Sequence, residues 1–221
     1  MSEATLSRVG ASAGVLSVIL TFAGFALHGG LPDSTTAEAV RSYVEHIGRH
    51  QAGIGNYVEL LGYLLFLVFA AFLYAVARVQ TSGRLNWLPI VALVSASAYV
   101  AVSAAAIAAQ QMIVEWGKVG ADPKNVLGVY ILDENAFTLS FELAALFLAA
   151  VGLSVLPRQG MLRLTGMTAL AVAAILFLCG LIGTAYIDSG ISQAGFLLLV
   201  LWTLLAAAYL LIRPPLPTES V

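Results

Sequence analysis

The sequence predicts an all-α polytopic membrane protein, a six-helix transmembrane bundle with one short amphipathic helix on its outer side. Of the 221 residues, 60% are hydrophobic and only 10% are charged, whereas soluble domains carry about 25% charged residues. The apolar residues gather in long runs without the alternation typical of membrane β-strands. Helices are therefore expected rather than a β-barrel, the other closed structure that can span lipid.

Six stretches are long enough to cross a bilayer, which takes about 20 apolar residues per helix. Their approximate bounds are residues 9–28, 54–77, 87–113, 136–156, 165–186 and 193–212. The connections are too short to hold a second globular domain, so residues 1–221 are expected to form a single transmembrane domain. We expect the first stretch to be an uncleaved span, because no small-x-small cleavage site lies near its end.

Charges divide the connections into two sides. One side carries mostly arginines, with few acidic residues: Arg8, Arg78, Arg84, Arg158, Arg163 and Arg213, with Glu3 and Glu219. The other side carries most of the acidic residues: Asp33, Glu38, Glu45, Glu115, Asp122, Asp133, Glu134 and Asp188, with Arg41, Arg49, Lys118 and Lys124. The positive-inside rule therefore predicts that both termini lie in the cytoplasm.

Two outer connections carry local signals. Thr35-Thr36-Ala37-Glu38 is typical of a capping box. The apolar residues that follow recur at helical spacing, which predicts a short amphipathic helix that lies on the outer interface or caps the bundle; they are Val40, Tyr43, Val44 and Ile47. In the second connection, residues 115–135, Asp122-Pro123 and two glycines predict only a partial amphipathic turn.

Two carboxylates lie inside predicted spans, where a charge costs at least ~2.5 kcal/mol near the bilayer centre. Glu59 lies nineteen residues before Arg78, and Glu142 lies sixteen before Arg158. At 1.5 Å per residue these separations are about 28 Å and about 24 Å, so both carboxylates are expected in the outer part of the bilayer. Small or polar residues flank both on their helical faces, which indicates that both face the bundle.

These observations predict a polar pocket open to the outside, near His28 at the end of the first span. The candidate residues are Glu59, Glu142, Asn56, Tyr63, Tyr99, Ser103, Gln110 and Asn135. A structural interpretation stays open for both acids. Glu59 could reach the outer interface with its side chain. Glu142 could be protonated and hydrogen-bonded, and serve only to fix helix packing.

No catalytic, metal or cofactor signature is present. The sequence lacks a Gly-x-Ser-x-Gly elbow, a Walker loop and a Cys-x-x-Cys pair. Its only cysteine is Cys179, so no intrachain disulfide can form. His46 and His50 are spaced for one helical face and could hold a metal, but a solvated face is the better interpretation, because Arg49 disfavours a bound cation. We therefore expect no metal, no cofactor and no catalytic residue.

A small-residue motif, Gly10-x-x-x-Gly14, occurs in the first span. Such motifs let helix backbones approach closely. We expect it to pack the first helix inside the bundle rather than to form a dimer.

Several scattered segments resemble a bacterial membrane family catalogued as domain of unknown function 4386. The segment Gly55-Asn56-Tyr57-Val58-Glu59-Leu60-Leu61-Gly62 is similar to the start of an early helix of that family. Further similarities lie in Leu73-Tyr74, Leu156-Pro157-Arg158, Leu201-Trp202-Thr203 and Leu211-Ile212-Arg213. The resemblance covers nearly the whole chain. It implies a membrane-helix fold in the inner membrane of a bacterium and supplies no mechanism.

The sequence leaves three classes of function open. The first is a non-enzymatic membrane protein that binds a lipid, a small apolar ligand or a partner membrane protein. The alternative is a small transporter or proton-coupled carrier that uses Glu59 and Glu142. A membrane enzyme with an outward-facing site ranks last. The lipid bilayer is the expected environment, and nucleic acid is excluded, because ten basic residues against twelve acidic ones provide no basic face. The sequence does not determine the oligomeric state.

Overall fold

The computed structural model describes residues 3–29, 36–46, 49–81, 85–119, 123–186 and 189–213. This part of the chain is helical and contains no strand. Six of its helices are long and apolar enough to cross a membrane, which confirms the predicted fold class. The helices are α1 (Glu3–His28), α2 (Ala37–His46), α3 (Arg49–Gln80), α4 (Leu88–Lys118), α5 (Pro123–Val155), α6 (Met161–Tyr186) and α7 (Ser189–Ile212).

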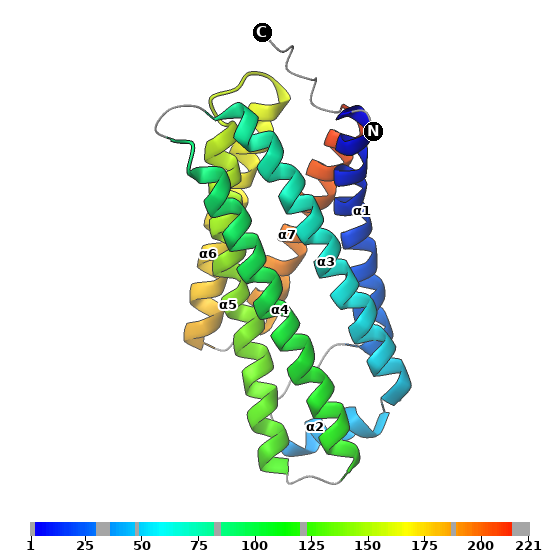
Figure 1. Ribbon diagram of the computed structural model, residues 1–221. Helices are drawn as coiled ribbons and strands as arrows, with labels where there is room; N and C mark the ends of the chain where they lie inside the picture. Colours follow the sequence, from blue (N-terminus) through cyan, green and yellow to red (C-terminus); the bar gives the residue numbers. More distant parts are fainter. Residues whose placement is uncertain are drawn as a thin grey trace.

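The six long helices lie side by side in one elongated bundle (Figure 1). Each packs against the next along the chain, and α7 packs back against α1, so the helices close into a ring. Helix α5 also contacts α3 and α7, which places it nearest the centre of the bundle. We call the end where α2 lies the α2 end. The opposite end, where α1 begins and α7 ends, is the terminal end.

The middle of the bundle is an aromatic and aliphatic core. Phe69, Phe141 and Phe147 are completely buried. The ring of Phe66 packs edge-on against Tyr99 and Phe147, with centroids 5.3 and 5.5 Å apart, a geometry that aromatic rings prefer. Large apolar side chains such as those along the outer face of α6 remain exposed in the bundle, as expected for helices that face lipid.

Small residues let α1 approach its neighbours. A Cβ on Gly10 would lie 2.4 Å from the Phe72 ring, and one on Gly14 would lie 2.8 Å from both Phe69 and Ala207. The two glycines therefore seat α1 directly on α3 and α7. The prediction that Gly10-x-x-x-Gly14 packs inside the bundle is confirmed.

The predicted span 136–156 was too short at its beginning, because α5 starts at Pro123. Proline suits the first position of a helix, where its missing N–H removes no bond. The added turns are held by packing: Val126 and Tyr130 are buried with Ile113 of α4. The partial turn expected for residues 115–135 is therefore wrong; the connection between α4 and α5 is much shorter, and both helices continue toward the α2 end.

The predicted amphipathic helix is confirmed as α2, and it caps the bundle. It packs across the ends of α4 and α5 (Figure 1). Tyr43 packs against the cluster of Ile113, Val126 and Tyr130. Its cap differs from the prediction by one residue: the Ala39 N–H donates to Thr36 Oγ1 at 3.3 Å. Thr36 is thus the N-cap and the capping box is wrong, because Glu38 does not stand three residues beyond it; Thr35 lies outside the described residues.

Candidate functional site

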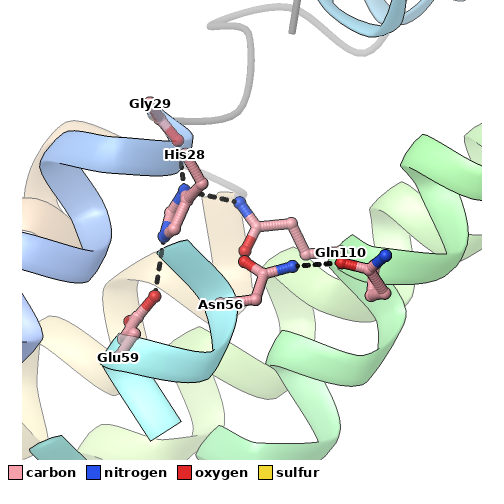
Figure 2. A network of polar contacts seen from close by, with 6 residues as sticks. His28, Gly29, Asn56, Glu59 and Gln110 are labelled. Carbon is pink, nitrogen blue, oxygen red and sulfur yellow. Dashed lines mark hydrogen bonds and ion pairs between the residues drawn. The ribbon is translucent and has the colours of Figure 1, made fainter. Parts of the chain in front are cut away.

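Polar side chains of α1, α3 and α4 meet at the α2 end of the bundle. We call His28, Asn56, Glu59, Gln110 and Gln111 the α2-end network; Figure 2 shows His28 between Glu59 and Gln110. Three of the eight predicted pocket residues belong to it: Asn56, Glu59 and Gln110. Sequence analysis also placed His28 close to this site.

Two glycines make the contact between α1 and α3 close enough for the central pair. A Cβ on Gly24 would lie 2.5 Å from the backbone nitrogen of Glu59, and one on Gly55 would lie 2.8 Å from that of His28. The two backbones therefore nearly touch. His28 and Glu59 are buried as a result, with 3% and 8% of their surfaces exposed.

His28 and Glu59 share one proton. The Nδ1 atom of His28 contacts the carbonyl oxygen of Gly29; a carbonyl only accepts, so Nδ1 carries a hydrogen and donates it. On the other side of the ring, Nε2 lies 2.7 Å from Glu59 Oε2. This bond needs one proton, placed either on the ring or on the carboxyl. Both placements leave the pair without net charge, which is the form that a low-dielectric interior tolerates.

Gln110 approaches the same ring atom. Its Nε2 lies 3.1 Å from His28 Nδ1, yet Nδ1 is already a donor to Gly29. The two contacts agree when the Gln110 amide turns its oxygen toward the ring, since amide nitrogen and oxygen are interchangeable in shape. The imidazole is then held on both sides, and its orientation toward Glu59 follows from its neighbours.

A second chain of bonds leads from α3 along α4. Asn56 Nδ2 donates to Gln111 Oε1 at 3.0 Å, and Gln111 Nε2 donates to Glu115 Oε1 at 3.1 Å. Asn56 is 4% exposed, and its Oδ1 accepts no hydrogen bond from the described residues. A buried acceptor without a donor is destabilising by about 1–3 kcal/mol. A hydrogen-bond donor that reaches Asn56 Oδ1 would remove this cost.

Three further predicted residues form a cluster of hydroxyl-bearing side chains deeper in the bundle. Tyr63 and Tyr99 meet edge-on with centroids 5.7 Å apart, and Ser103 lies beside them. The Ser103 hydroxyl is buried beside both phenols. A cavity of about 20 Å³ borders Tyr63, Tyr99, Thr21 and Thr203. That is room for about one water molecule.

Two residues at the α2 end were missed as site residues. Asp133 of α5 is 9% exposed and lies close enough to Glu59 and Glu134 for their charges to interact. Sequence analysis placed Asp133 in a connection because the predicted span, residues 136–156, began after it. The signal was present: Val126, Tyr130, Asp133 and Phe137 recur at the spacing of one helical face.

Tyr43 of α2 is the second missed residue. Its hydroxyl is buried and lies within hydrogen-bonding reach of the Gln110 amide. Burial raises the pKa of Tyr43 from its ordinary value of 10.0 to about 12; the nearby Gln110 amide opposes this rise, and the charge of Asp133 adds to it. At neutral pH the hydroxyl is therefore protonated, and it lies near Gln110 and Asp133.

Glu142 and Asn135 are not brought into the network. A Cβ on Gly180 would lie 3.1 Å from Glu142 Cγ, so Glu142 packs on α6. It lies nine residues beyond Asp133, or about two and a half turns, and therefore on the opposite face of α5. Asn135 Nδ2 donates to Ile131 O of its own helix at 2.8 Å. The helix register thus separates the two predicted spanning glutamates.

No group of three His, Cys, Asp or Glu side chains suited to a metal occurs among the described residues. His46 is the last residue of α2, and its Nδ1 lies 2.7 Å from Ser42 O. His50 belongs to α3. The two histidines therefore do not share one helix, contrary to the spacing argument.

Comparisons with protein-family models, curated proteins and solved structures found no match. The resemblance to domain of unknown function 4386 stays a prediction. What is established is a multi-pass helical membrane protein with a buried polar network at one end of its bundle.

Proposed function

We propose that this protein is a non-enzymatic, proton-coupled carrier whose exchangeable proton resides on the His28–Glu59 pair. The single observation that carries the proposal is the 2.7 Å contact between two buried ionisable side chains. A site that already shares one proton is suited to gain or lose a proton when a second charged group arrives or leaves, because the total charge of the site can then stay constant.

The surroundings of the pair support a carrier over binding of a lipid or small apolar ligand. The network consists of amide, imidazole and carboxyl groups, and the cavity beneath it that borders Tyr63 and Tyr99 has a volume of about 20 Å³, far below the several hundred Å³ of a typical ligand pocket. Polar groups lie toward the α2 end, whereas Phe69, Phe141 and Phe147 fill the middle of the bundle. This distribution of polar and aromatic side chains corresponds to a carrier whose binding site faces one side of the membrane only.

The proposed roles differ from those first expected. Glu59 exchanges the proton, and His28 shares it. Glu142 is left out, because its side chain packs on α6.

The proposed location is the inner membrane of a bacterium, with the α2 end outside and both termini in the cytoplasm. Exposed arginines at the terminal end of the described chain support this orientation through the positive-inside rule; they are Arg8, Arg78, Arg158, Arg163 and Arg213. Cysteines introduced at Ser42 and at Gln159, with Cys179 replaced, test it in intact cells. An impermeant thiol reagent should label position 42 and spare position 159; the reverse pattern would overturn the orientation.

The function is tested with the full chain in liposomes loaded with a pH-sensitive dye. Alkali cations, alkylammonium ions, amino acids and sugars are added one at a time outside, and internal pH is followed. We expect at least one solute to move protons through the wild type and not through Glu59→Gln or His28→Ala. Glu142→Gln is the matched control and should behave as wild type. No solute-dependent proton movement, or equal movement in Glu59→Gln, would overturn the proposal.

A further inference from the structure

Hydroxyl side chains continue from the α2-end network toward the middle of the bundle. On α3, Tyr63 follows Glu59 by four residues, which is about one helical turn, or about 6 Å, deeper. On α1, Thr21 precedes His28 by seven residues, about two turns. Tyr63 and Tyr99 both lie close enough to Glu59 for its charge to interact with them. Because a hydroxyl both accepts and donates a hydrogen, these two side chains are suited to take up a proton from Glu59.

The same hydroxyl side chains border the cavity of about 20 Å³ between α1, α3, α4 and α7. The lining residues that carry a hydroxyl are Ser17, Thr21, Tyr63, Tyr99 and Thr203. A water molecule needs roughly 10–15 Å³ of such space and two to four polar partners, whereas cavities that stay dry are lined by apolar groups. Both the size and the lining of this cavity therefore suit one water molecule.

The lining also supplies the two kinds of hydrogen-bond partner that water requires. Ser17 Oγ donates to Gly14 O at 2.7 Å, and Thr203 Oγ1 donates to Leu199 O at 2.9 Å. Each of these two hydroxyls has thereby used its one hydrogen and keeps lone pairs that accept from water. The tyrosine hydroxyls have a hydrogen to donate as well as lone pairs. A water molecule here finds acceptors on α1 and α7 and donors on α3 and α4.

We infer that this cavity binds one internal water molecule, and that the water and the tyrosine hydroxyls form the inner part of the proton route from Glu59; the inference rests on the function proposed above. The proton leaves Glu59 for the oxygen of Tyr63 or Tyr99, and that tyrosine gives its own hydrogen to the water. The water then releases one of its hydrogens to the next hydroxyl. Each oxygen receives one proton and releases another, so no charge remains behind. Ser95, buried one turn beyond Tyr99, continues the route toward the terminal end of α4.

The water site is tested by hydroxyl-radical labelling of the purified full-length protein. A brief X-ray pulse forms radicals from water molecules where they lie, and mass spectrometry identifies the oxidised side chains. We expect oxidation of Tyr63 and Tyr99, although each is only 4% exposed, because radicals form inside the cavity. Phe69 and Phe141 are internal controls. They are completely buried and do not line this cavity, so they should stay unmodified.

Val18→Leu tests whether the labelling comes from the cavity. It adds one carbon to a side chain that lines the cavity and leaves every hydroxyl in place. Oxidation of Tyr63 and Tyr99 should fall about fivefold or more, since the remaining space is too small for water. Val94→Leu makes the same change on an exposed face of α4 and should leave the oxidation unchanged. Tyrosine oxidation in wild type no higher than that of Phe69, or equal oxidation in Val18→Leu, would overturn the inference.

The role in proton transfer is tested in the dye-loaded liposomes with the same series of solutes. Tyr63→Phe combined with Tyr99→Phe should slow proton movement about tenfold or more, because a phenyl ring passes no proton. Tyr209→Phe, on α7 outside the cavity, is the matched control and should behave as wild type. Unchanged proton movement in the double variant would overturn the route. Oxidised tyrosines without any proton movement through wild type would instead remove the carrier function and leave the water site standing.

Discussion

Glu59 and Glu142 are the same residue type in two spanning helices, and each packs on a glycine of a neighbouring helix. Glu59 lies against Gly24 of α1, and Glu142 lies against Gly180 of α6. Their environments differ nevertheless. Glu59 is buried and bonded to His28, whereas Glu142 is only partly buried and lies outside the network.

The difference shows that depth in the bilayer does not determine what an ionisable side chain does. A buried carboxyl needs a partner that faces it from another helix. α1 offers Glu59 a histidine at its last turn, where the helix dipole also favours positive charge. α6 offers Glu142 the small surface of Gly180. The residue that the neighbouring helix presents, rather than the glutamate itself, determines whether the glutamate joins a hydrogen-bond network or only packs against that helix.

The largest effect is expected from His28→Ala. Removing one partner of a buried pair leaves the other without compensation, which destabilises proteins by about 3–5 kcal/mol. Unfolding of the detergent-purified protein should show this loss. His46→Ala is the control, because that histidine is exposed on α2 and its loss should be nearly neutral. Adding Glu59→Gln to His28→Ala should restore part of the stability; a further loss of stability would contradict the paired description.

Gly24→Ala should be clearly more destabilising than Gly180→Ala. The added methyl at position 24 would lie 2.5 Å from a backbone nitrogen of α3, whereas at position 180 it meets the flexible side chain of Glu142 at 3.1 Å. We expect overpacking to cost about 1–3 kcal/mol at position 24. At position 180 the higher helix propensity of alanine, about 1 kcal/mol, should offset the contact. Thermal unfolding of both variants measures this difference in stability. Equal losses of stability in the two variants would contradict the prediction.

Glu59→Gln should destabilise the protein more than Glu142→Gln, although by a smaller amount than the first two changes. The amide can still donate to His28 Nε2, so only the charge-assisted part of the bond is lost, about 1 kcal/mol. Glu142→Gln should stay within about 0.5 kcal/mol of wild type. Unfolding in mixed detergent at neutral pH gives both values. A larger loss for Glu142→Gln would show that it has a partner as important as His28.

The smallest effect at neutral pH concerns Tyr43, whose contribution emerges only at alkaline pH. Its folded pKa of about 12 lies above its ordinary value of 10.0. The unfolded chain therefore releases the phenol proton first, and wild type should lose stability as pH rises from 10 toward 12. Tyr43→Phe should lack this component of the loss. Melting temperatures of the two proteins across that range test it; parallel curves would show that the hydroxyl is solvated.

Much of the fold followed from the chain alone, because lipid forces backbone groups to bond within each helix and long apolar runs leave no other choice. The ends of helices were harder to predict. Residues 123–135 are polar enough to resemble a connection, yet they form the first turns of α5 because Val126 and Tyr130 pack on α4 beneath Tyr43. The same late start hid Asp133, which is buried near Glu59.

By itself the sequence determined that the protein crosses the membrane on six helices, and that Asn56, Glu59 and Gln110 lie near one end of them. Composition and the rise per residue are enough for that. Only the tertiary structure decided that Glu59 meets His28 and that Glu142 lies apart on α6. Which face of each helix meets which neighbour depends on close packing between helices far apart in the chain, through contacts such as Gly24 against Glu59, and spacing along one helix does not contain that information.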